Sequence, residues 1–330
     1  MISGILKYVI IVFAVCAQLG TTDAAADIKM RALTAWQPAH PLIKVMDRYI
    51  ENVELATDGK ITFIKNGPEV VPPFEQLEPT QKNIFQFLLT TGSYNFGVDG
   101  ILLGADTFKP DSALIRSAGV FDWMDRYYQE KFNLKLVAIA SAGQFQLVLR
   151  SPPSDSDDVL GRNIRGTINY HSLIRKLHGS PVAMPVSQIY AALEKGVVDG
   201  FAFAQVGLLQ LKFYEVGAKY LVRPLFGQVP VIILMNLDAF QQLSDRDQSI
   251  ILQEGDRVEQ WAQKYYKSLA IEEENSLRDK GVEITNWGGN SVHIKKWFSD
   301  GVWELVERFS HEDGKKFHEF ARKAGVVNDK

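Results

Sequence analysis

The chain has 330 residues, of which 46% are hydrophobic and 23% charged, and these fractions are typical of a globular protein and not of a disordered one. Its 36 basic and 39 acidic residues give a formal net charge of −3, which argues against a nucleic-acid partner and against a polybasic membrane-binding surface. At roughly 100–200 residues per domain, we expect two domains.

The first 26 residues have the pattern of a secretory signal peptide. Lys7 precedes an apolar run over residues 8–17, which is too short to span a bilayer, and Ala24-Ala25-Ala26 offers a small-residue cleavage site. Cys16, the only cysteine, lies inside this segment, so the mature chain is expected to form neither disulfides nor a thiolate metal site. No later stretch approaches 18 uninterrupted apolar residues, which predicts an exported protein that is not membrane-embedded.

The mature chain opens with a β-α-β pattern. Alternating apolar residues predict a strand over residues 28–36, and apolar residues at helical spacing predict a helix over residues 42–53. Asp58-Gly59 then forms a turn before a second strand over residues 60–64. A parallel sheet is the natural expectation for this order of elements.

The middle of the chain is less regular. We predict a helix over residues 81–89, irregular aromatic structure over residues 111–131, and strands over residues 134–140 and 145–149. The segment Ser151-Pro-Pro-Ser-Asp-Ser-Asp-Asp158 is the clearest shift in composition, and it is typical of a linker near a crossing between domains.

The second half repeats the alternation of strands and helices. We expect strands over residues 163–168 and 197–203, with a helix over residues 171–178, and a buried strand over residues 230–236. Nothing between Asp245 and Lys280 breaks a helix, and about 35 residues at 1.5 Å each would extend about 50 Å. A helix of that length is expected to lie across two domains.

Sequence motifs give little support for an enzyme. Gly-x-Ser-x-Gly, Gly-x-Gly-x-x-Gly and the phosphate-binding loop are absent, and the six histidines never occur as His-x-x-x-His. We therefore expect no metal and no cofactor. An exported α/β hydrolase acting through His171 or His178 remains an alternative.

Arg165 is the strongest candidate for a binding residue. It ends a short predicted strand in Asn163-Ile-Arg165, and a guanidinium at a strand end can hold a carboxylate by two parallel hydrogen bonds. The other interpretation is an arginine on the surface of a strand. Trp36, Tyr94, Phe201 and Phe203 lie near predicted strand ends, where ligands bind in open α/β sheets, although ordinary core packing is an alternative for each.

Several separate motifs resemble those of the DctP-type solute-binding proteins of TRAP transporters. The family patterns G-x-K-[IL]-R, GA-x-P-x-x-[ML]-P and E-x-Y-x-AL-x-x-G-x-[VI]-DG are similar, in order, to Gly161-Arg-Asn-Ile-Arg165, Gly179-Ser-Pro-Val-Ala-Met-Pro185 and Ile189-Tyr-Ala-Ala-Leu-Glu-Lys-Gly-Val-Val-Asp-Gly200. The long helix fits as well, and the resemblance covers most of the mature chain.

The resemblance implies an α/β, two-lobed periplasmic-binding-protein-like fold with crossing strands and a long helix spanning both lobes. Lobe I would comprise residues 27–142 and 231–270, and lobe II residues 143–230 and 271–330. It implies a periplasmic receptor, not an enzyme, that closes on a small organic acid and delivers it to the TRAP membrane permease subunits. In the family, the arginine that matches Arg165 pairs with the ligand carboxylate. A ligand-presenting receptor for a sensor is the remaining alternative.

The sequence departs from the family's sialic-acid binders at the pocket. Phe203 stands where those proteins have an asparagine, and the position of a second pocket arginine falls near Gln144 or Phe145. In the relatives that bind 2-oxo acids with a metal ion a carboxylate occurs in this region, and Ala202 offers none. These differences predict a monocarboxylate with an apolar or aromatic body. The other residues expected to contact it, across the two lobes, are Trp36, Glu69, Tyr94, Phe201 and Gln228.

Overall fold

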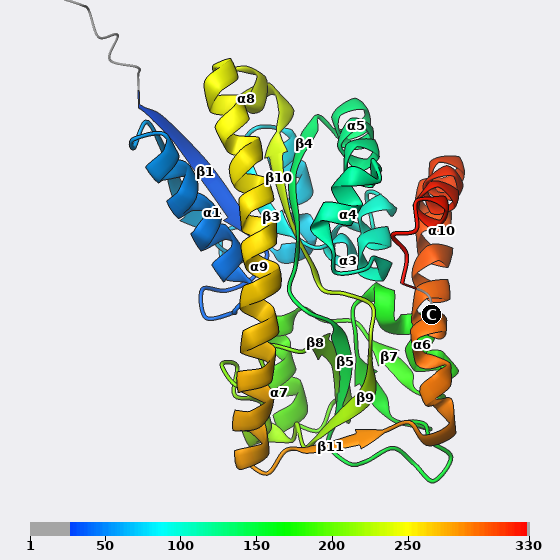
Figure 1. Ribbon diagram of the computed structural model, residues 1–330. Helices are drawn as coiled ribbons and strands as arrows, with labels where there is room; N and C mark the ends of the chain where they lie inside the picture. The colour runs from blue at the N-terminus through cyan, green and yellow to red at the C-terminus, as the bar shows by residue number, and fades with distance from the viewer. Residues whose placement is uncertain (1–26, 329–330) are drawn as a thin grey trace, which may run out of the picture.

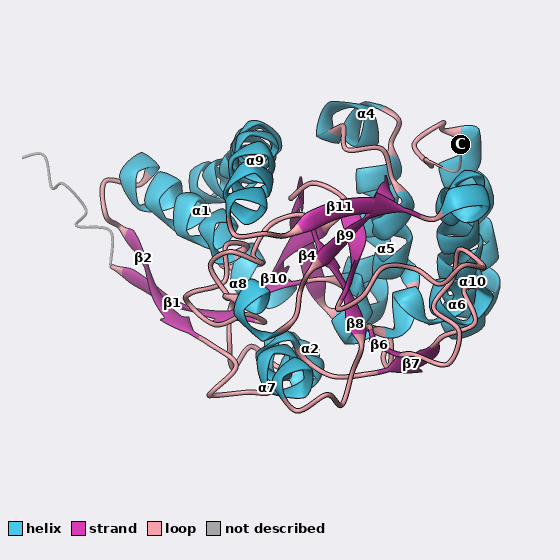
Figure 2. Cartoon of the chain, turned by 90° about the horizontal axis from the view of Figure 1, so that it is seen from below, coloured by secondary structure: helices cyan, strands magenta, loops and turns pink. Residues whose placement is uncertain are grey.

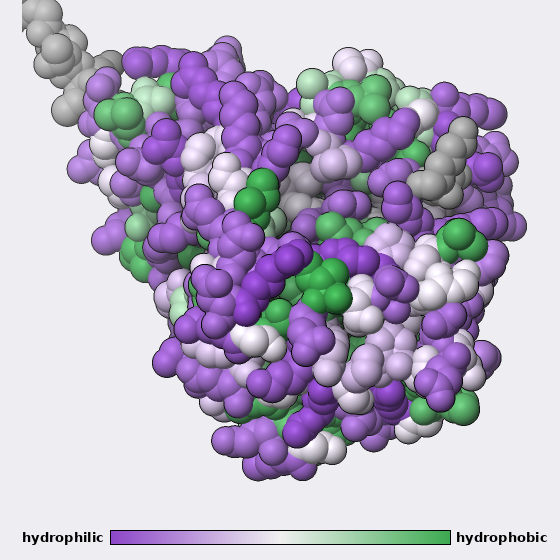
Figure 3. Space-filling view, turned by 60° about the horizontal axis from the view of Figure 1, so that its bottom comes forward, coloured by the Kyte–Doolittle hydropathy of each residue, from purple (hydrophilic) through white to green (hydrophobic). Residues whose placement is uncertain are grey.

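The computed structural model describes residues 27–328, which form two α/β lobes joined by two short segments and a long helix (Figure 1). The signal peptide predicted for residues 1–26 lies outside the described residues. Among residues 27–328, no helix combines the length and apolar character needed to cross a bilayer. The face of the molecule in Figure 3 is covered mostly by hydrophilic residues, and hydrophobic ones occur there in small groups.

Lobe I is built on a five-stranded sheet. In spatial order its strands are β2 (Ile61–Asn66), β1 (Ile28–Thr34), β3 (Phe87–Thr90), β10 (Pro230–Asn236) and β4 (Leu134–Ser141). β1 pairs in parallel with β2 and β3, as the β-α-β pattern predicts, whereas β10 runs antiparallel to β3 and β4. The helices of this lobe are α1 (Ile43–Ala56), α2 (Leu77–Gln81), α3 (Gly92–Asn95), α4 (Ser112–Ser117), α5 (Val120–Phe132) and α8 (Leu237–Gln241).

Lobe II is built on a six-stranded sheet. Its strands, in spatial order, are β11 (Glu283–Asn286), β9 (Tyr220–Phe226), β5 (Phe145–Leu149), β8 (Gly200–Ala204), β6 (Asn163–Arg165) and β7 (Ser180–Val182). Figure 2 shows this sheet with its covering helices from below. These helices include α6 (His171–Lys176), α7 (Ile189–Glu194) and α10 (Ile294–Lys323), the last of which also packs on the 3₁₀ helix Ile101–Thr107 of lobe I.

The chain crosses between the lobes twice through short segments that lie between strands. Residues 142–144 join β4 to β5, and residues 227–229 join β9 back to β10. The two segments are bonded to each other, because Ala142 N donates to Val229 O and Val229 N donates to Gly143 O, each at 2.9 Å. These two segments, and the long helix that follows residue 244, connect the two lobes covalently.

The helix α9 (Asp245–Asp279) runs along both lobes. Ser244 caps its start by accepting from Asp247 N. Toward its C-terminal end, the carboxylate of Glu273 accepts from the backbone N–H of Gly207 in lobe II at 2.9 Å. Tyr266 donates to Pro41 O in lobe I, also at 2.9 Å. The prediction of a helix of about 35 residues lying across two domains is confirmed.

Three sequence predictions are wrong. Residues 81–89 are not one helix: α2 ends at Gln81, and residues 87–90 form β3, a strand buried between two others whose uninterrupted apolar run carries no period to distinguish it from a helix. Residues 111–131 are not irregular, because Asp111 caps α4 and the buried Phe121, Met124 and Tyr128 follow helical spacing along α5. Residues 151–158 join β5 to β6 within one sheet and so do not lie at a lobe crossing.

Candidate functional site

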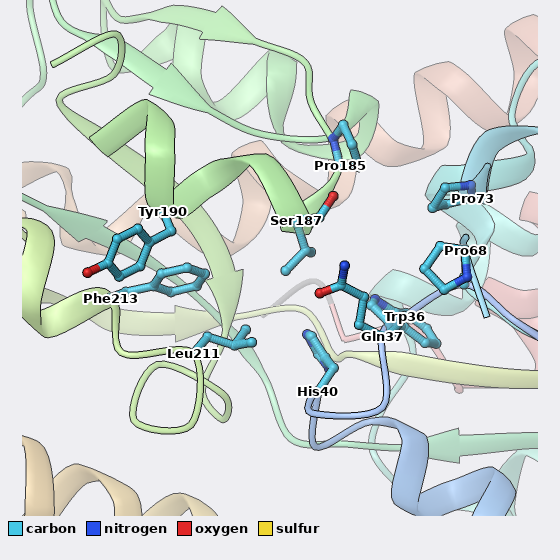
Figure 4. Close-up of a pocket in the computed structure, with 12 residues that line it drawn as sticks. Trp36, Gln37, His40, Pro68, Pro73, Pro185, Ser187, Tyr190, Leu211 and Phe213 are labelled. Carbon is cyan, nitrogen blue, oxygen red and sulfur yellow. The ribbon is translucent and has the colours of Figure 1, made fainter. Parts of the chain in front are cut away.

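Two adjoining cavities lie between the lobes. The inner cavity, of about 50 Å³, is lined from lobe I mainly by Trp36, His40, Thr91, Ser93 and Tyr94, and from lobe II mainly by Phe145, Arg165, Thr167, Tyr170, Val186 and Phe203. The outer cavity, of about 170 Å³, shares Trp36, His40 and Val186 with it and continues past Gln37, Ser187, Tyr190 and Phe213 (Figure 4). A molecule held in this space would touch both lobes.

Arg165 is the cationic group of the inner cavity. It ends β6, and its side chain is only 2% exposed. Its Nε and Nη2 donate to Met184 O at 3.0 and 2.7 Å, and its Nη1 donates to Ala202 O at 3.1 Å. A guanidinium has five N–H groups, so one N–H remains on each terminal nitrogen. These two hydrogens remain available to the oxygens of a ligand.

The charge of Arg165 has no acidic partner among residues 27–328, since none of the ion pairs between described residues includes it. Burial lowers the pKa of Arg165, and the neighbouring Tyr94 and Tyr170 act in the opposite direction. The guanidinium remains protonated at neutral pH. Burial also raises the pKa of Tyr94 and of Tyr170, so both phenols are neutral. A buried, unpaired cation is costly, and an anion placed beside it would remove much of that cost.

Aromatic rings form the walls of the inner cavity. Trp36 lies in the loop that follows β1, Tyr94 lies in α3 just after β3, and their ring centroids are 6.0 Å apart. Phe203 lies near the end of β8 in lobe II, and the centroid of its ring is 5.9 Å from that of His40 in lobe I. The walls can therefore cover the apolar body of a ligand on more than one side.

The structure brings together Arg165, Trp36, Tyr94 and Phe203 from the set of residues expected to bind the ligand, and it places the other four elsewhere. Phe201 is fully buried against Phe213, with 5.1 Å between the ring centroids. Glu69 is exposed and accepts from Gly67 N.

The two glutamines lie outside both cavities. Gln144 donates to Gly227 O at 3.3 Å and lines a groove beside α9, together with Gln205 and Tyr266. Gln228 is buried, and its Nε2 donates to Ala105 O at 2.8 Å.

The histidines proposed for an exported hydrolase line neither cavity. His171 bonds to Gly166 O through Nε2 at 3.1 Å, and His178 is an exposed side chain bonded to Asp158 at 2.8 Å. Within residues 27–328, no group of three or more His, Cys, Asp or Glu side chains could hold a metal ion.

Sequence reasoning missed His40, Thr167 and Tyr190. His40 lies in the segment Pro38-Ala-His-Pro41, whose prolines indicate only that the preceding strand ends there. The available signal was its position after the carboxyl end of a parallel strand, the edge at which α/β sheets bind ligands.

Comparisons with known proteins agree with this architecture. Residues 117–300 match the family model of bacterial extracellular solute-binding protein, family 7 (DctP). A solute-binding protein of Sulfitobacter sp. strain NAS-14.1 is 24% identical over 257 residues, which cover 74% of this chain and 77% of that protein.

Two solved structures have a similar fold. A TRAP periplasmic solute-binding protein from Desulfovibrio salexigens with bound orotic acid has a TM-score of 0.79 at 17% identity, covering 90% of this chain and 98% of its own. DctP7 of Bordetella pertussis, an extracytoplasmic solute receptor binding pyroglutamic acid, has a TM-score of 0.75 at 14% identity, covering 89% and 99%.

Proposed function

This chain belongs to family 7 of the bacterial extracellular solute-binding proteins, the DctP family, and we propose that it captures a small organic monocarboxylate between its lobes. Arg165 is the clamp for the carboxylate. The solute-binding proteins it resembles are receptors, and the orotic and pyroglutamic acids named for two structural neighbours are both carboxylic acids.

One observation carries the proposal: a buried guanidinium faces the inner cavity with two free N–H groups and no acidic partner among the described residues. Its other three donors are held by Met184 O and Ala202 O, which fix its orientation. A carboxylate would form charge-assisted bonds with a group that is already positioned, so little entropy is lost on binding.

Trp36, Tyr94 and Phe203 would enclose the body of the ligand. These rings come from both lobes, so a ligand gains contacts only when the lobes are together. Binding would therefore shift the population toward the closed form, because a ligand stabilises the state in which it makes more contacts.

The receptor would be exported to the periplasm by residues 1–26 and would pass its ligand to the TRAP permease subunits. We propose residues 27–142 and 231–270 as lobe I and residues 143–230 and 271–330 as lobe II, which puts one boundary in the crossing segment 142–144 and another one residue after the crossing segment 227–229.

The direct test is native mass spectrometry of freshly purified protein, looking for a co-purified acid, followed by thermal-shift measurements with a panel of small molecules. We expect the largest shifts with branched or aromatic monocarboxylates. Larger shifts with neutral sugars or with dicarboxylates would contradict the proposal.

A further inference from the structure

His40 occupies a central position between the two cavities. It lies in the turn between β1 and α1 and lines both cavities, and it is only 3% exposed. Its ring is stacked on Trp36 at a centroid distance of 5.7 Å, with Phe203 of the other lobe at 5.9 Å. Figure 4 shows the imidazole at the edge of the outer cavity, next to Gln37. These neighbours hold the ring in one orientation.

The proton of His40 is assigned to one nitrogen by its hydrogen bond. The backbone N–H of Leu42 donates to Nδ1 of His40 at 3.2 Å. A backbone N–H can only donate, so Nδ1 must be the unprotonated nitrogen and the proton of the neutral ring must be on Nε2. Nε2 has no hydrogen-bond partner among the described residues, so it is a free donor beside the cavities.

The ring is also uncharged. Burial, followed by the neighbouring charge of Arg165, lowers the pKa of His40 to about 3. Arg165 is then the one charged side chain among the described residues that line the inner and outer cavities. A pocket with a single positive charge fits a ligand with a single negative charge, because a second carboxylate would be buried without a partner.

Building on the proposed function, we propose that His40 selects among monocarboxylates by donating from Nε2 to a neutral acceptor oxygen close to the carboxylate held by Arg165. The ligand class is thus a monocarboxylate with a carbonyl, ether or hydroxyl oxygen a few bonds from the acid group.

The size of the inner cavity sets that spacing. His40 and Arg165 both line this cavity of about 50 Å³, and they are close enough that the charge of Arg165 contributes to the lowered pKa of His40. Only a few ligand atoms fit between the two donors. An acid without the acceptor oxygen would leave the Nε2–H of His40 buried and unbonded, which is more costly than the loss of an ordinary hydrogen bond.

Two substitutions separate the roles of the two nitrogens. His40→Asn puts an amide oxygen near the position of Nδ1, where it can still accept from Leu42 N, but it has no group at the position of Nε2. His40→Gln reaches that position with an amide N–H₂ and keeps a donor there. Circular dichroism and thermal melting of both variants report whether each is folded.

The experiment compares pairs of acids that differ only in a 2-oxo group: pyruvate and propanoate, 4-methyl-2-oxopentanoate and 4-methylpentanoate, and phenylpyruvate and 3-phenylpropanoate. By calorimetry we expect the native protein to prefer the oxo acid by about tenfold within a pair that binds, in line with the cost of an unpaired buried donor. His40→Asn should bring this ratio close to one, and His40→Gln should retain a preference.

Equal affinity for both members of a pair in the native protein would overturn the role of His40 and leave the carboxylate receptor standing. A preference for the oxo acid that persists in His40→Asn would also overturn the role of His40. Failure of the native protein to bind any of the six acids would instead count against the proposed function itself, and the role of His40 would fall with it.

Discussion

Asn169 donates from Nδ2 to Oδ2 of Asp106 at 2.7 Å, and this buried hydrogen bond joins lobe II to lobe I. Thr167, which lines the inner cavity, donates in turn to Oδ1 of Asn169 at 2.6 Å. The wall of the cavity is therefore linked to a carboxyl group of the opposite lobe. The other oxygen of that carboxyl, Oδ1 of Asp106, is buried with no partner among the described residues.

The first prediction concerns the pH dependence of stability. Burial raises the pKa of Asp106 well above its ordinary value of 3.8, and the bond from Asn169 only partly opposes the rise. The folded state thus binds a proton that the unfolded chain releases above about pH 4, so Asp106 makes the free energy of unfolding fall as pH rises from there toward the folded pKa. Asp106→Asn should remove this part of the slope, and denaturant titrations between pH 4 and pH 8 would measure it.

The matched control is Asp155→Asn, because Asp155 is an exposed carboxylate in the loop between β5 and β6. That variant should keep the slope of the native protein. If Asp106→Asn and the native protein lost stability equally with rising pH, the raised pKa of Asp106 would be refuted.

The second prediction tests the geometry of the arginine clamp. Arg165→Lys keeps the positive charge, but an ammonium has three N–H groups and cannot both satisfy the carbonyls of Met184 and Ala202 and hold two carboxylate oxygens. We expect affinity for the co-purified acid to fall by about 2–3 kcal/mol, or roughly 30- to 150-fold, measured by calorimetry.

Arg175→Lys is the control for this change, since Arg175 is exposed on α6 of the same lobe. It should bind like the native protein. Near-normal affinity of Arg165→Lys, in a protein with a native thermal melt, would show that Arg165 is a structural residue only.

The third prediction separates two neighbouring aromatic residues of β8. Phe201 is fully buried against Phe213, whereas Phe203 lines the inner cavity and lies close to His40. Phe201→Leu should lower stability by about 1–2 kcal/mol with little change in affinity, because it leaves a void in the core. Phe203→Leu should weaken ligand binding several-fold with a smaller loss of stability.

Thermal melting and calorimetry on the two variants would give both quantities side by side. The reverse pattern, with affinity controlled by Phe201, would mean that the ligand enters the core of lobe II instead of the space between the lobes.

Much of the fold was predictable from local sequence patterns. The alternation over residues 28–34 and the helical spacing that follows it gave β1 and α1, and the uninterrupted run after Ser244 gave α9. β3 was not predictable in the same way. Its four residues are all buried between two other strands, so they show no alternation, and only tertiary contacts decide that they form a strand.

The sequence was sufficient to predict which strand ends meet at the candidate site. It was not sufficient to predict the direction in which an individual side chain near those ends points. Gln144 and Phe145 are neighbours in an extended segment, so their side chains leave on opposite sides, and only Phe145 reaches the inner cavity. Gln228 lies next to Val229 of the cavity wall, but its amide bonds to Ala105 O instead. Residue type and sequence position do not encode these orientations.

The last prediction concerns the packing of α9 on lobe I. A Cβ atom added to Gly255 would come within 2.3 Å of the carbonyl oxygen of Val137 in β4, so the helix approaches the sheet at a distance that only glycine permits. Gly255→Ala must push α9 outward, which we expect to cost about 1–3 kcal/mol of stability despite the better helix propensity of alanine. Because α9 also holds Gly207 of lobe II through Glu273, the shift should weaken ligand binding as well.

Gly97→Ala is the control, because a Cβ atom there meets nothing within 4 Å, so the substitution should leave both stability and affinity unchanged. A Gly255→Ala protein as stable as the native one would show that the helix can move away from β4 freely, and that it does not hold the two lobes in register.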